Sequence, residues 1–448
     1  MKRLKNIIVQ ENNFKNIIKY VLSLTNSSLI CSEVVVEKIS GINISIRNSN
    51  VELIEFNKDY ILTITIYKNN RTAVVSSTDL SFKSIKKIVC TAMDIVTYSS
   101  IDKFSGLPDR QLLAIGKIKD LNLFHNCKWD INDTIELIKL SEQEAFQENK
   151  YIVNTEGANF NSCIRTYAFG NSLGMIECYS TTLYSISCCV IAERYGNMQR
   201  DFSFSVSRDV DDLYSPKKIG RDSARKAMSR LNPKKIPTMK VPIIFSSEIA
   251  SEFFLHFAKA ISGNCVYQKS TFLLNDLNTA VFPSWLTIEE HPHLEKGLSS
   301  RCFDSEGVET KLKKIVDRGV LKTWLLDTYS ARKINSVSTG NAGGIHNWLV
   351  LGYSNMCLKK LLGVMNTGIL ITELLGEGVS ITTGNYSRGA VGFWIDNGVL
   401  KYPVNEITIS GNLREMFKNV SVIGNDIDKR HSIQSGSVLL SSIQVSGL

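Results

Sequence analysis

Prolines gather in one short segment near the middle of the chain, and this segment limits the possible folds more than any other feature. Four of the eight prolines lie there: Pro216, Pro233, Pro237 and Pro242. Proline has no backbone N–H and interrupts helices and central strands, so regular structure should break here. The length of 448 residues also exceeds what one hydrophobic core usually serves. We therefore predict two domains, residues 1–215 and 243–448, joined by a basic, proline-containing junction at 216–242.

The junction also carries the positive charge of the chain. It holds nine basic residues and one acidic residue, Asp222, so its net charge is +8, against +9 for the whole chain. The basic residues are Lys217, Lys218, Arg221, Arg225, Lys226, Arg230, Lys234, Lys235 and Lys240. Aromatic residues that could stack on bases are missing from this segment, and no nucleic-acid-binding motif accompanies it. We expect a solvated basic helix and linker without direct nucleic-acid binding; attraction to an acidic partner is the alternative.

The first domain mixes the periodicities of helices and strands. Apolar residues recur every three or four positions over residues 14–22 and 85–96, which predicts two amphipathic helices. A third helix is predicted near Asp133, with Glu136 as its capping-box partner. Strands are predicted at Val34–Glu37 and Gly41–Asn48, around a polar turn, and at Tyr60–Tyr67. The mixture predicts an α+β fold class, with an N-terminal mixed α/β domain.

The second domain is dominated by short runs of strand-forming residues. These runs are Val308–Ile315, Val320–Leu326, Ile369–Leu374, Ala390–Ile395, Val399–Val404, Glu406–Ile409 and Val438–Val445. The turn Asp396-Asn397-Gly398 between two of them is the strongest hairpin signal in the chain. We predict a β-rich C-terminal sheet or barrel domain with a few helices.

Cysteine usage and hydropathy indicate the cellular compartment. The ten cysteines are scattered along the chain. The adjacent pair Cys188 and Cys189 should point to opposite faces of a strand, so the two thiols cannot bind one metal ion. We therefore expect buried reduced thiols. The only apolar run near the N-terminus, Ile7–Val9, is too short for a signal peptide, and no run is long enough to span a bilayer. We predict a cytoplasmic protein without membrane contact.

One histidine on an apolar segment is the first candidate for chemistry. The segment Leu255–Ser262, LHFAKAIS, should lie on a helix that begins at Ser246 or Ser247 and ends at Gly263. A catalytic zinc site needs three protein ligands and an acid or base beside the bound water. His256 alone supplies neither, so a hydrogen-bonded core histidine is the simpler interpretation.

Two other segments carry candidate binding groups. Glu289-Glu290-His291-Pro292-His293 could bind a metal if alternate side chains of a strand share a face; an exposed turn is the alternative. The glycine-rich segment Thr339–Gly344 lacks the lysine of a phosphate-binding loop. It is a structural turn or a place where a peptide backbone approaches closely.

Several long phrases of the sequence closely resemble the TldE (PmbA) branch of the TldD/TldE family. They are VYQKSTFLLNDL (Val266–Leu277), WLTIEEHPHL (Trp285–Leu294), FDSEGVETK (Phe303–Lys311), LLDTYSARK (Leu325–Lys333), STGNAGGIHNW (Ser338–Trp348), GNYSRGAVGFWIDNG (Gly384–Gly398) and EITISGNL (Glu406–Leu413), with SSTDLS (Ser76–Ser81) and NTEGANFNS (Asn154–Ser162) in the first domain. The resemblance covers nearly the whole chain.

The resemblance implies a bacterial cytosolic metallopeptidase built from two related subunits. In that family TldD carries a metal-binding HExxxH helix and a further cysteine near its C-terminus, whereas TldE lacks this set. Here His256 matches the first histidine, Phe257 replaces the glutamate and Ile261 replaces the second histidine; no cysteine follows Cys357. The resemblance therefore implies no metal and no catalytic residue in this chain, and zinc in a TldD-like partner.

The leading hypothesis is a non-metal-bearing subunit that presents unfolded or flexible peptides, of the microcin-precursor or antitoxin class, to the partner's metal. Candidate substrate-binding residues are Asn341, Gly343, Gly344, His346 and Tyr386. The alternatives are a self-sufficient metallopeptidase that uses His256 with His291, His293 or His346, and a regulatory protein that binds DNA gyrase. In isolation the chain could form a homodimer.

Overall fold

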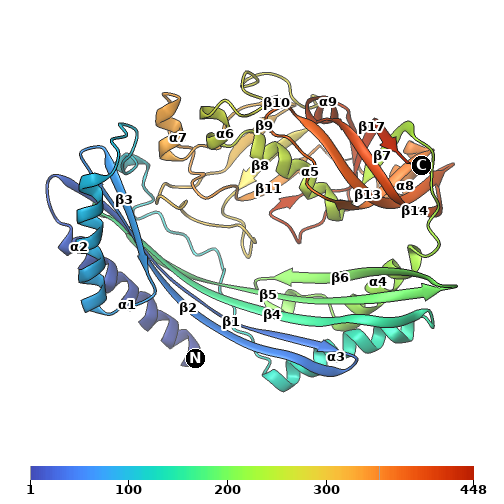
Figure 1. The fold of residues 1–448 in the computed structure, drawn as a ribbon, viewed down its shortest axis with the longest axis horizontal. Helices are drawn as coiled ribbons and strands as arrows, with labels where there is room; N and C mark the ends of the chain where they lie inside the picture. The colour runs from blue at the N-terminus through green and yellow to red at the C-terminus, as the bar shows by residue number, and fades with distance from the viewer. Residues whose placement is uncertain (1, 353, 448) are drawn as a thin grey trace.

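A long, bowed antiparallel sheet forms the N-terminal part of the molecule (Figure 1). The structure is a computed structural model that describes residues 2–352 and 354–447. In spatial order the six strands are β3 (Arg71–Ser77), β2 (Asn50–Lys68), β1 (Ile30–Arg47), β4 (Ile152–Asn171), β5 (Ile176–Arg194) and β6 (Asn197–Ser207). Four of these strands are 18 to 20 residues long, so the sheet extends well beyond the reach of a single helix.

Helices cover the outer, convex face of this sheet. They are α1 (Lys2–Leu24), α2 (Phe82–Tyr98), α3 (Ile131–Glu148) and α4 (Pro216–Ser229). Figure 1 shows α1, α2 and α3 on that side, with the C-terminal half of the chain above the concave side. Two separate cores result: α1 and α2 pack on one end of the sheet, around Ile64 and Val89, while α3 and α4 pack on the other, around Ile44 and Ile219.

The C-terminal half contains a sheet that closes on itself. Its strands follow the order β14 (Val399–Asn412), β13 (Asn385–Asp396), β12 (Gly368–Leu375), β7 (Met239–Phe245), β17 (Val438–Ser446) and β15 (Val420–Ile423). Because β14 also pairs with β17, five of these strands form a ring. The α+β fold class, with a β-rich sheet or barrel in the C-terminal domain, is therefore confirmed.

A second, smaller sheet lies beside the barrel. It has the order β10 (Val320–Leu321), β9 (Lys313–Asp317), β8 (Thr287–His291), β11 (Asn347–Leu351) and β16 (Ile433–Gln434). The helices of this half are α5 (Ser247–Ala260), α6 (Gly263–Tyr267), α7 (Thr328–Lys333), α8 (Leu358–Met365) and α9 (Leu413–Lys418). One large core joins both sheets through α5, and its centre is a group of phenylalanine rings that includes Phe253, Phe257 and Phe417.

The two halves contact each other through an aromatic cluster on the concave face of the first sheet. The Phe303 ring lies 5.9 Å from that of Phe169 and 5.6 Å from that of Tyr179, centroid to centroid. Leu113 and Leu121, on the long connection between α2 and α3, complete this cluster. The C-terminal half is thus anchored by apolar contact near the end of β4 and the start of β5.

Most predicted elements are present, with instructive differences in the first domain. The predicted polar turn before Gly41 is wrong, because β1 runs unbroken through it. A β-carbon on Gly41 would lie 1.9 Å from the carbonyl oxygen of Ser162, so this glycine permits close strand approach and does not form a turn. The capping box of α3 uses Asp130 and Asp133, three residues before the predicted pair.

In the second domain, too, some predicted elements are confirmed and others differ from the structure. The Asn397-Gly398 hairpin is confirmed, with φ values of 53° and 70°. Two predicted strands, at 399–404 and 406–409, are a single strand, β14, in which Glu406 has a φ of 52°. The strand predicted at 308–315 begins only at Lys313.

The basic segment is largely neutralised by acidic neighbours. Six of its nine basic residues form ion pairs: Lys217 and Arg221 with Glu144, Arg225 with Glu148, Lys226 with Glu248, Arg230 with Asp201 and Glu373, and Lys235 with Glu406. The helix α4 starts at Pro216, as proline at a first helical position allows, and its apolar side packs on the first sheet. The predicted domain limits stay a prediction.

The cysteines are all free thiols. Burial was predicted for them but applies only to some, since Cys31, Cys90 and Cys357 are exposed. Cys188 is buried in the core, whereas Cys189 on the opposite face of β5 lies 3.3 Å from Glu156, as the alternation of a strand requires.

Three carboxyl groups meet where the concave face of the sheet approaches the C-terminal half. Burial, with repulsion from Glu306 and Asp304, raises the pKa of Glu33 on β1 from 4.5 to about 8. Burial and Glu306 also raise the pKa of Asp304 to about 7. The folded protein therefore retains protons here that the unfolded chain has already released at neutral pH.

We expect stability to fall as the pH rises from about 4.5 to about 8, because ionisation of Glu33 is disfavoured only in the folded state. Glu33→Gln should remove part of this slope and raise the free energy of unfolding at pH 8 by about 1–2 kcal/mol, less than the full shift because the side chain is partly exposed. Denaturant unfolding at pH 5 and pH 8 measures this. Glu55→Gln, at an exposed position of β2, is the control; equal slopes for both variants would contradict the assignment.

Candidate functional site

The helix α5 carries the candidate histidine and lies at the centre of the C-terminal half. Ser246 occupies its N-cap position, but the hydroxyl of Ser437 on a neighbouring segment accepts the N–H of Ser247. The helix ends at Ala260, and Ile261 is its C-cap residue. Gly263 does not end this helix, as predicted, but begins the next one, α6.

His256 faces a small cavity beside the segment that leads into β13. The cavity has a volume of about 270 Å³, and its lining residues are Glu252, Leu255, His256, Lys259, Glu377, Val379, Ile381 and Arg388. The imidazole meets the Tyr386 ring edge-on at 5.9 Å. Its Nε2 atom is buried and has no hydrogen-bond partner among the described residues, as is also true of the Tyr386 hydroxyl. Sequence reasoning expected a hydrogen-bonded core histidine, and the structure shows an unpaired one.

The surroundings of His256 disfavour positive charge. Burial, together with the nearby cations Lys259 and Arg388, lowers the pKa of His256 from 6.5 to about 4. Arg388 donates to Glu252 at 2.6 Å, which keeps its guanidinium in place beside the cavity. The imidazole is consequently neutral at physiological pH.

The other two positions of the HExxxH pattern lie in the core and do not face this cavity. Phe257 is fully buried, with ring centroids 5.0 Å from Phe282 and 5.5 Å from Phe417. Ile261 is also fully buried. Across the described part of the chain, no three histidine, cysteine, aspartate or glutamate side chains gather in a way that could bind a metal ion. A lone imidazole between two cations does not fit a zinc site.

A buried carboxylate, Glu290 on β8, forms the centre of the second candidate cluster. Asn341 Nδ2 donates to both of its oxygens at 3.1 Å, and the N–H of His346 donates at 3.0 Å. Trp348 Nε1 donates at 3.1 Å, and Lys313 Nζ lies 3.1 Å away as the counter-ion. Burial alone would raise the pKa of Glu290, but Lys313 and these donors outweigh it and lower the pKa below its ordinary value.

This network changes how the predicted substrate-binding residues are understood. Asn341 and His346 are buried and bonded to the protein itself; His346 Nε2 also lies 3.0 Å from the carbonyl oxygen of Gly340. Gly343 and Gly344 are exposed, with φ values of 88° and 114° that favour glycine. Tyr386 is in a different place, against His256. The five residues therefore divide between the glycine loop and the His256 cavity.

The histidines of the Glu289–His293 segment do not converge on one point. His291 Nε2 contacts Glu289 at 2.9 Å, whereas His293 Nε2 contacts the hydroxyl of Thr310 at 3.1 Å. Glu290, which lies between Glu289 and His291, points the other way, into the core. The metal-binding interpretation of this segment does not fit the structure, and Glu290 has a structural role that the alternating burial of a strand could have suggested.

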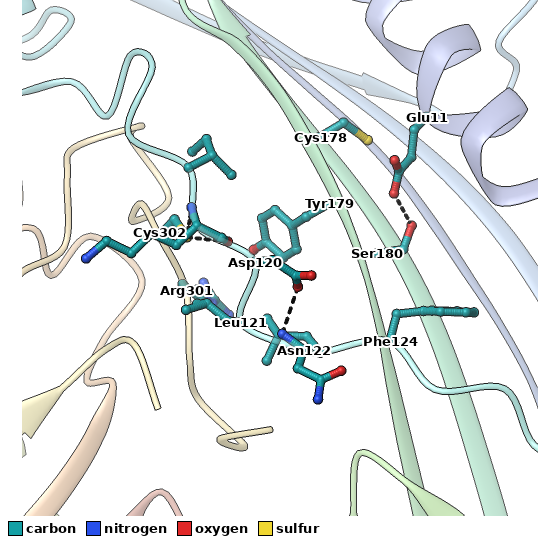
Figure 2. Close-up of a pocket in the computed structure, with 13 residues that line it drawn as sticks. Glu11, Asp120, Leu121, Asn122, Phe124, Cys178, Tyr179, Ser180, Arg301 and Cys302 are labelled. Carbon is teal, nitrogen blue, oxygen red and sulfur yellow. Dashed lines mark hydrogen bonds between the residues drawn. The ribbon is translucent and has the colours of Figure 1, made fainter. Parts of the chain in front are cut away.

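A larger pocket, which the sequence did not reveal, opens between the first sheet and the C-terminal half (Figure 2). It has a volume of about 420 Å³, and residues 118–124, part of β5, Glu11, Arg301 and Cys302 line it. Arg301 lies near Tyr179 in this pocket, and Asp120 accepts the N–H of Asn122 (Figure 2). The guanidinium of Arg301 makes none of the hydrogen bonds or ion pairs found among the described residues. A β-carbon on Gly343 would lie 3.8 Å from Arg301 Nη1, so the pocket adjoins the exposed glycine loop.

Comparisons with known proteins agree with the whole fold. Sequence profiles of the PmbA/TldA metallopeptidase match residues 32–96 (domain 1), 124–231 (central domain) and 238–447 (C-terminal domain). A metalloprotease PmbA homologue of Buchnera aphidicola subsp. Baizongia pistaciae is 70% identical over the full length of both chains. The chain belongs to the PmbA/TldD metallopeptidase family. Metalloprotease PmbA of Escherichia coli O157:H7 is 47% identical and covers 100% of this chain and 99% of its own length.

Solved structures of this family share the fold. A candidate modulator of DNA gyrase from Bacteroides thetaiotaomicron has 25% identity and a TM-score of 0.90, with full coverage of both chains. TldE from Thermococcus kodakarensis, at 18% identity and a TM-score of 0.81, covers 96% of this chain and 99% of its own and supports the fold alone. The resemblance to the PmbA branch is thus confirmed. Among the described residues, no helix is long and apolar enough to cross a membrane.

In this PmbA-type protein we expect Glu290→Gln to lower the free energy of unfolding by about 3–5 kcal/mol, because it leaves Lys313 without its counter-ion in the core. The substitution also replaces one acceptor oxygen by an amide NH2 group. This group cannot accept the hydrogen bonds that Asn341 and Trp348 donate. Denaturant unfolding followed by tryptophan fluorescence reports the change. Glu289→Gln, one residue away on the half-exposed face of β8, should cost less than about 1 kcal/mol; equal losses would contradict a central role for Glu290.

Proposed function

We propose that this chain is the non-metal-bearing, TldE-like subunit of a cytoplasmic TldD/TldE-type zinc peptidase. The observation that carries the proposal is where the three residues at the HExxxH positions lie. One histidine remains at the surface of a small cavity, while Phe257 and Ile261 are built into the core. Because both side chains are packed on all sides, the catalytic function would pass to a TldD-like partner that binds the zinc ion.

The contribution of this chain would be to bind and orient an unfolded peptide. Gly343 and Gly344 expose their backbone next to Arg301, whose guanidinium lines the neighbouring pocket and has no hydrogen-bond or ion-pair partner in the described part of the chain. Guanidinium groups bind peptide carbonyls and carboxylates well, and glycines let a second backbone approach closely. The substrates would be flexible polypeptides of the microcin-precursor or antitoxin class, in line with the family resemblance.

Two other functions are less well supported. A self-sufficient peptidase would need His256 to meet His291, His293 or His346, but these histidines have separate partners, and His346 is buried behind the glycine loop. A gyrase-binding regulator draws on the description of the Bacteroides relative and on the basic segment. The ion pairs of that segment neutralise much of the charge that would attract such a partner.

Metal analysis and peptidase assay of the purified chain test the proposal. We expect no stoichiometric zinc after incubation with zinc and gel filtration, and no cleavage of an unstructured peptide. Addition of a TldD-type subunit should produce cleavage that a chelator abolishes. Stoichiometric zinc with peptidase activity of the isolated chain would overturn the proposal, as would recovery of gyrase but of no TldD-like chain in a pull-down.

Within the reconstituted complex, Arg301→Ala should raise KM for the peptide several-fold with little change in kcat, because it removes a ground-state contact. Arg110→Ala, at an exposed position outside the lining of the Arg301 pocket, is the control. Unfolding curves of both variants exclude loss of fold as the cause. An unchanged KM for Arg301→Ala would show that Arg301 does not bind the substrate. It would not contradict the assignment of the chain as the TldE-like subunit.

A further inference from the structure

The imidazole of His256 has no partner within the protein, although it lines a cavity. Neither of its ring nitrogens forms a hydrogen bond with another described residue. Of the two, only Nε2 is both buried and unpaired, so Nδ1 remains accessible to a ligand. Polar groups at such depth are satisfied by protein, water or ligand in nearly all folded proteins. The cavity therefore offers an unused donor on a fixed element, the helix α5.

Two cations lie beside this imidazole in the lining of the cavity. Lys259 follows His256 by one helical turn, is exposed, and has neither an ion pair nor a hydrogen bond from its side chain within the described part of the chain. Arg388 on β13 is only 11% exposed and is held by Glu252 at 2.6 Å. Burial and these two cations lower the pKa of His256. The imidazole thus experiences a positive surrounding, although Glu252 and Glu377 also line the cavity.

Another part of the wall is apolar and fixed in place. Val379 and Ile381 line it, on the segment between β12 and β13. The N–H of Ser387 donates to the carbonyl oxygen of Gly378 at 2.7 Å, and that of Phe272 donates to the carbonyl oxygen of Ile381 at 3.0 Å. These backbone bonds tie the segment to its neighbours. An aliphatic side chain would therefore meet a preformed surface and would not have to order it.

The size and the charges of the cavity favour the end of a peptide over its middle. Its volume of about 270 Å³ lies below the roughly 300–1,000 Å³ of sites that enclose drug-sized ligands. Glu377 also lines it, is exposed, and has no ion pair from its side chain among the described residues. This carboxylate would repel a second negative group on the ligand. One carboxylate next to one aliphatic side chain fits these conditions, as in the last residue of a peptide.

We propose that the His256 cavity binds the C-terminal carboxylate of a peptide whose last residue is aliphatic. The ammonium of Lys259 and the Nδ1–H of the neutral His256 ring would donate to the carboxylate. Arg388 would add positive charge while it stays bonded to Glu252. The aliphatic side chain would contact the apolar wall. This inference rests on the function proposed above and deepens it, because a subunit that orients peptides would fix one end of the peptide here.

Binding of small probes to the purified chain, in buffer with a chelator, tests the ligand class. Acetyl-leucine has the required carboxylate, acetyl-leucinamide lacks it, and leucinamide has only an ammonium group. Acetyl-isoglutamine has a carboxylate on its side chain alone. Titration calorimetry should show saturable one-site binding of acetyl-leucine and at least tenfold weaker binding of the other three. Equal or tighter binding of any of the three would overturn the proposal, as would the absence of saturable binding of acetyl-leucine.

A pair of lysine variants tests the role of the cation. Lys259→Gln should raise the dissociation constant of acetyl-leucine at least fivefold, because it removes a charged donor from the cavity. Lys418→Gln is the matched control, since both lysines are exposed and lie in the last turn of a helix. Lys418 is not part of the cavity lining. Equal dissociation constants for the two variants would contradict the proposal.

Nuclear magnetic resonance of isotope-labelled histidine shows whether the probe reaches this cavity. The chain has six histidines, and the spectrum of His256→Gln identifies the signal of His256. Acetyl-leucine should shift this signal at pH 7, whereas acetyl-leucinamide should not. Binding without a shift of the His256 signal would overturn the proposal. Each of these failures would leave the zinc analysis and the reconstitution with a TldD-type subunit unchanged, so it is distinguishable from failure of the subunit assignment.

Discussion

The carboxylate of Glu290 is the interaction on which the C-terminal half depends. Four groups from three segments satisfy one buried charge: Lys313 on β9, Asn341 and His346 in the connection between α7 and β11, and Trp348 on β11. The Trp348 ring then lies 6.1 Å from Phe257 on α5. The small sheet, the glycine loop and the central helix are therefore fixed relative to one another. An uncompensated charge at this depth is too costly to tolerate, so the four donors must assemble together.

The same core surrounds the positions of α5 where an HExxxH helix would carry its glutamate and second histidine. The side of α5 that would carry the glutamate and the second histidine has become part of a phenylalanine core that includes Phe282 and Phe417. Restoring the missing residues would bury polar groups without partners. Phe257 and Ile261 are packed in the core, whereas the side of the helix that carries His256 faces a cavity.

The sequence was informative where a local pattern decides the structure and less so where distant strands decide it. The amphipathic helices α1 and α2 and the Asn397-Gly398 hairpin follow from spacing and turn chemistry alone. The strands β4 and β6 were missed, and β5 was predicted only around Cys188 and Cys189, although Tyr195 and Gly196, at φ values of 54° and 77°, mark the turn between β5 and β6. The pocket at Arg301 could not be predicted, because it unites segments nearly 300 residues apart, from Glu11 to Cys302. The role of Glu290 likewise depends on partners that only the fold brings together.

The order of strands in the first sheet has a consequence for how the chain reaches its native state. The strands β1 to β3 pair with their neighbours in sequence, and so do β4 to β6, but the junction between these groups joins residues such as Ile42 and Ser162. Such distant pairing carries a large loop-closure cost and forms late. The sheet thus consists of two local meanders joined by one long-range pairing, between β1 and β4. During synthesis the β1 edge of the first meander stays unpaired until residues beyond 150 have been made.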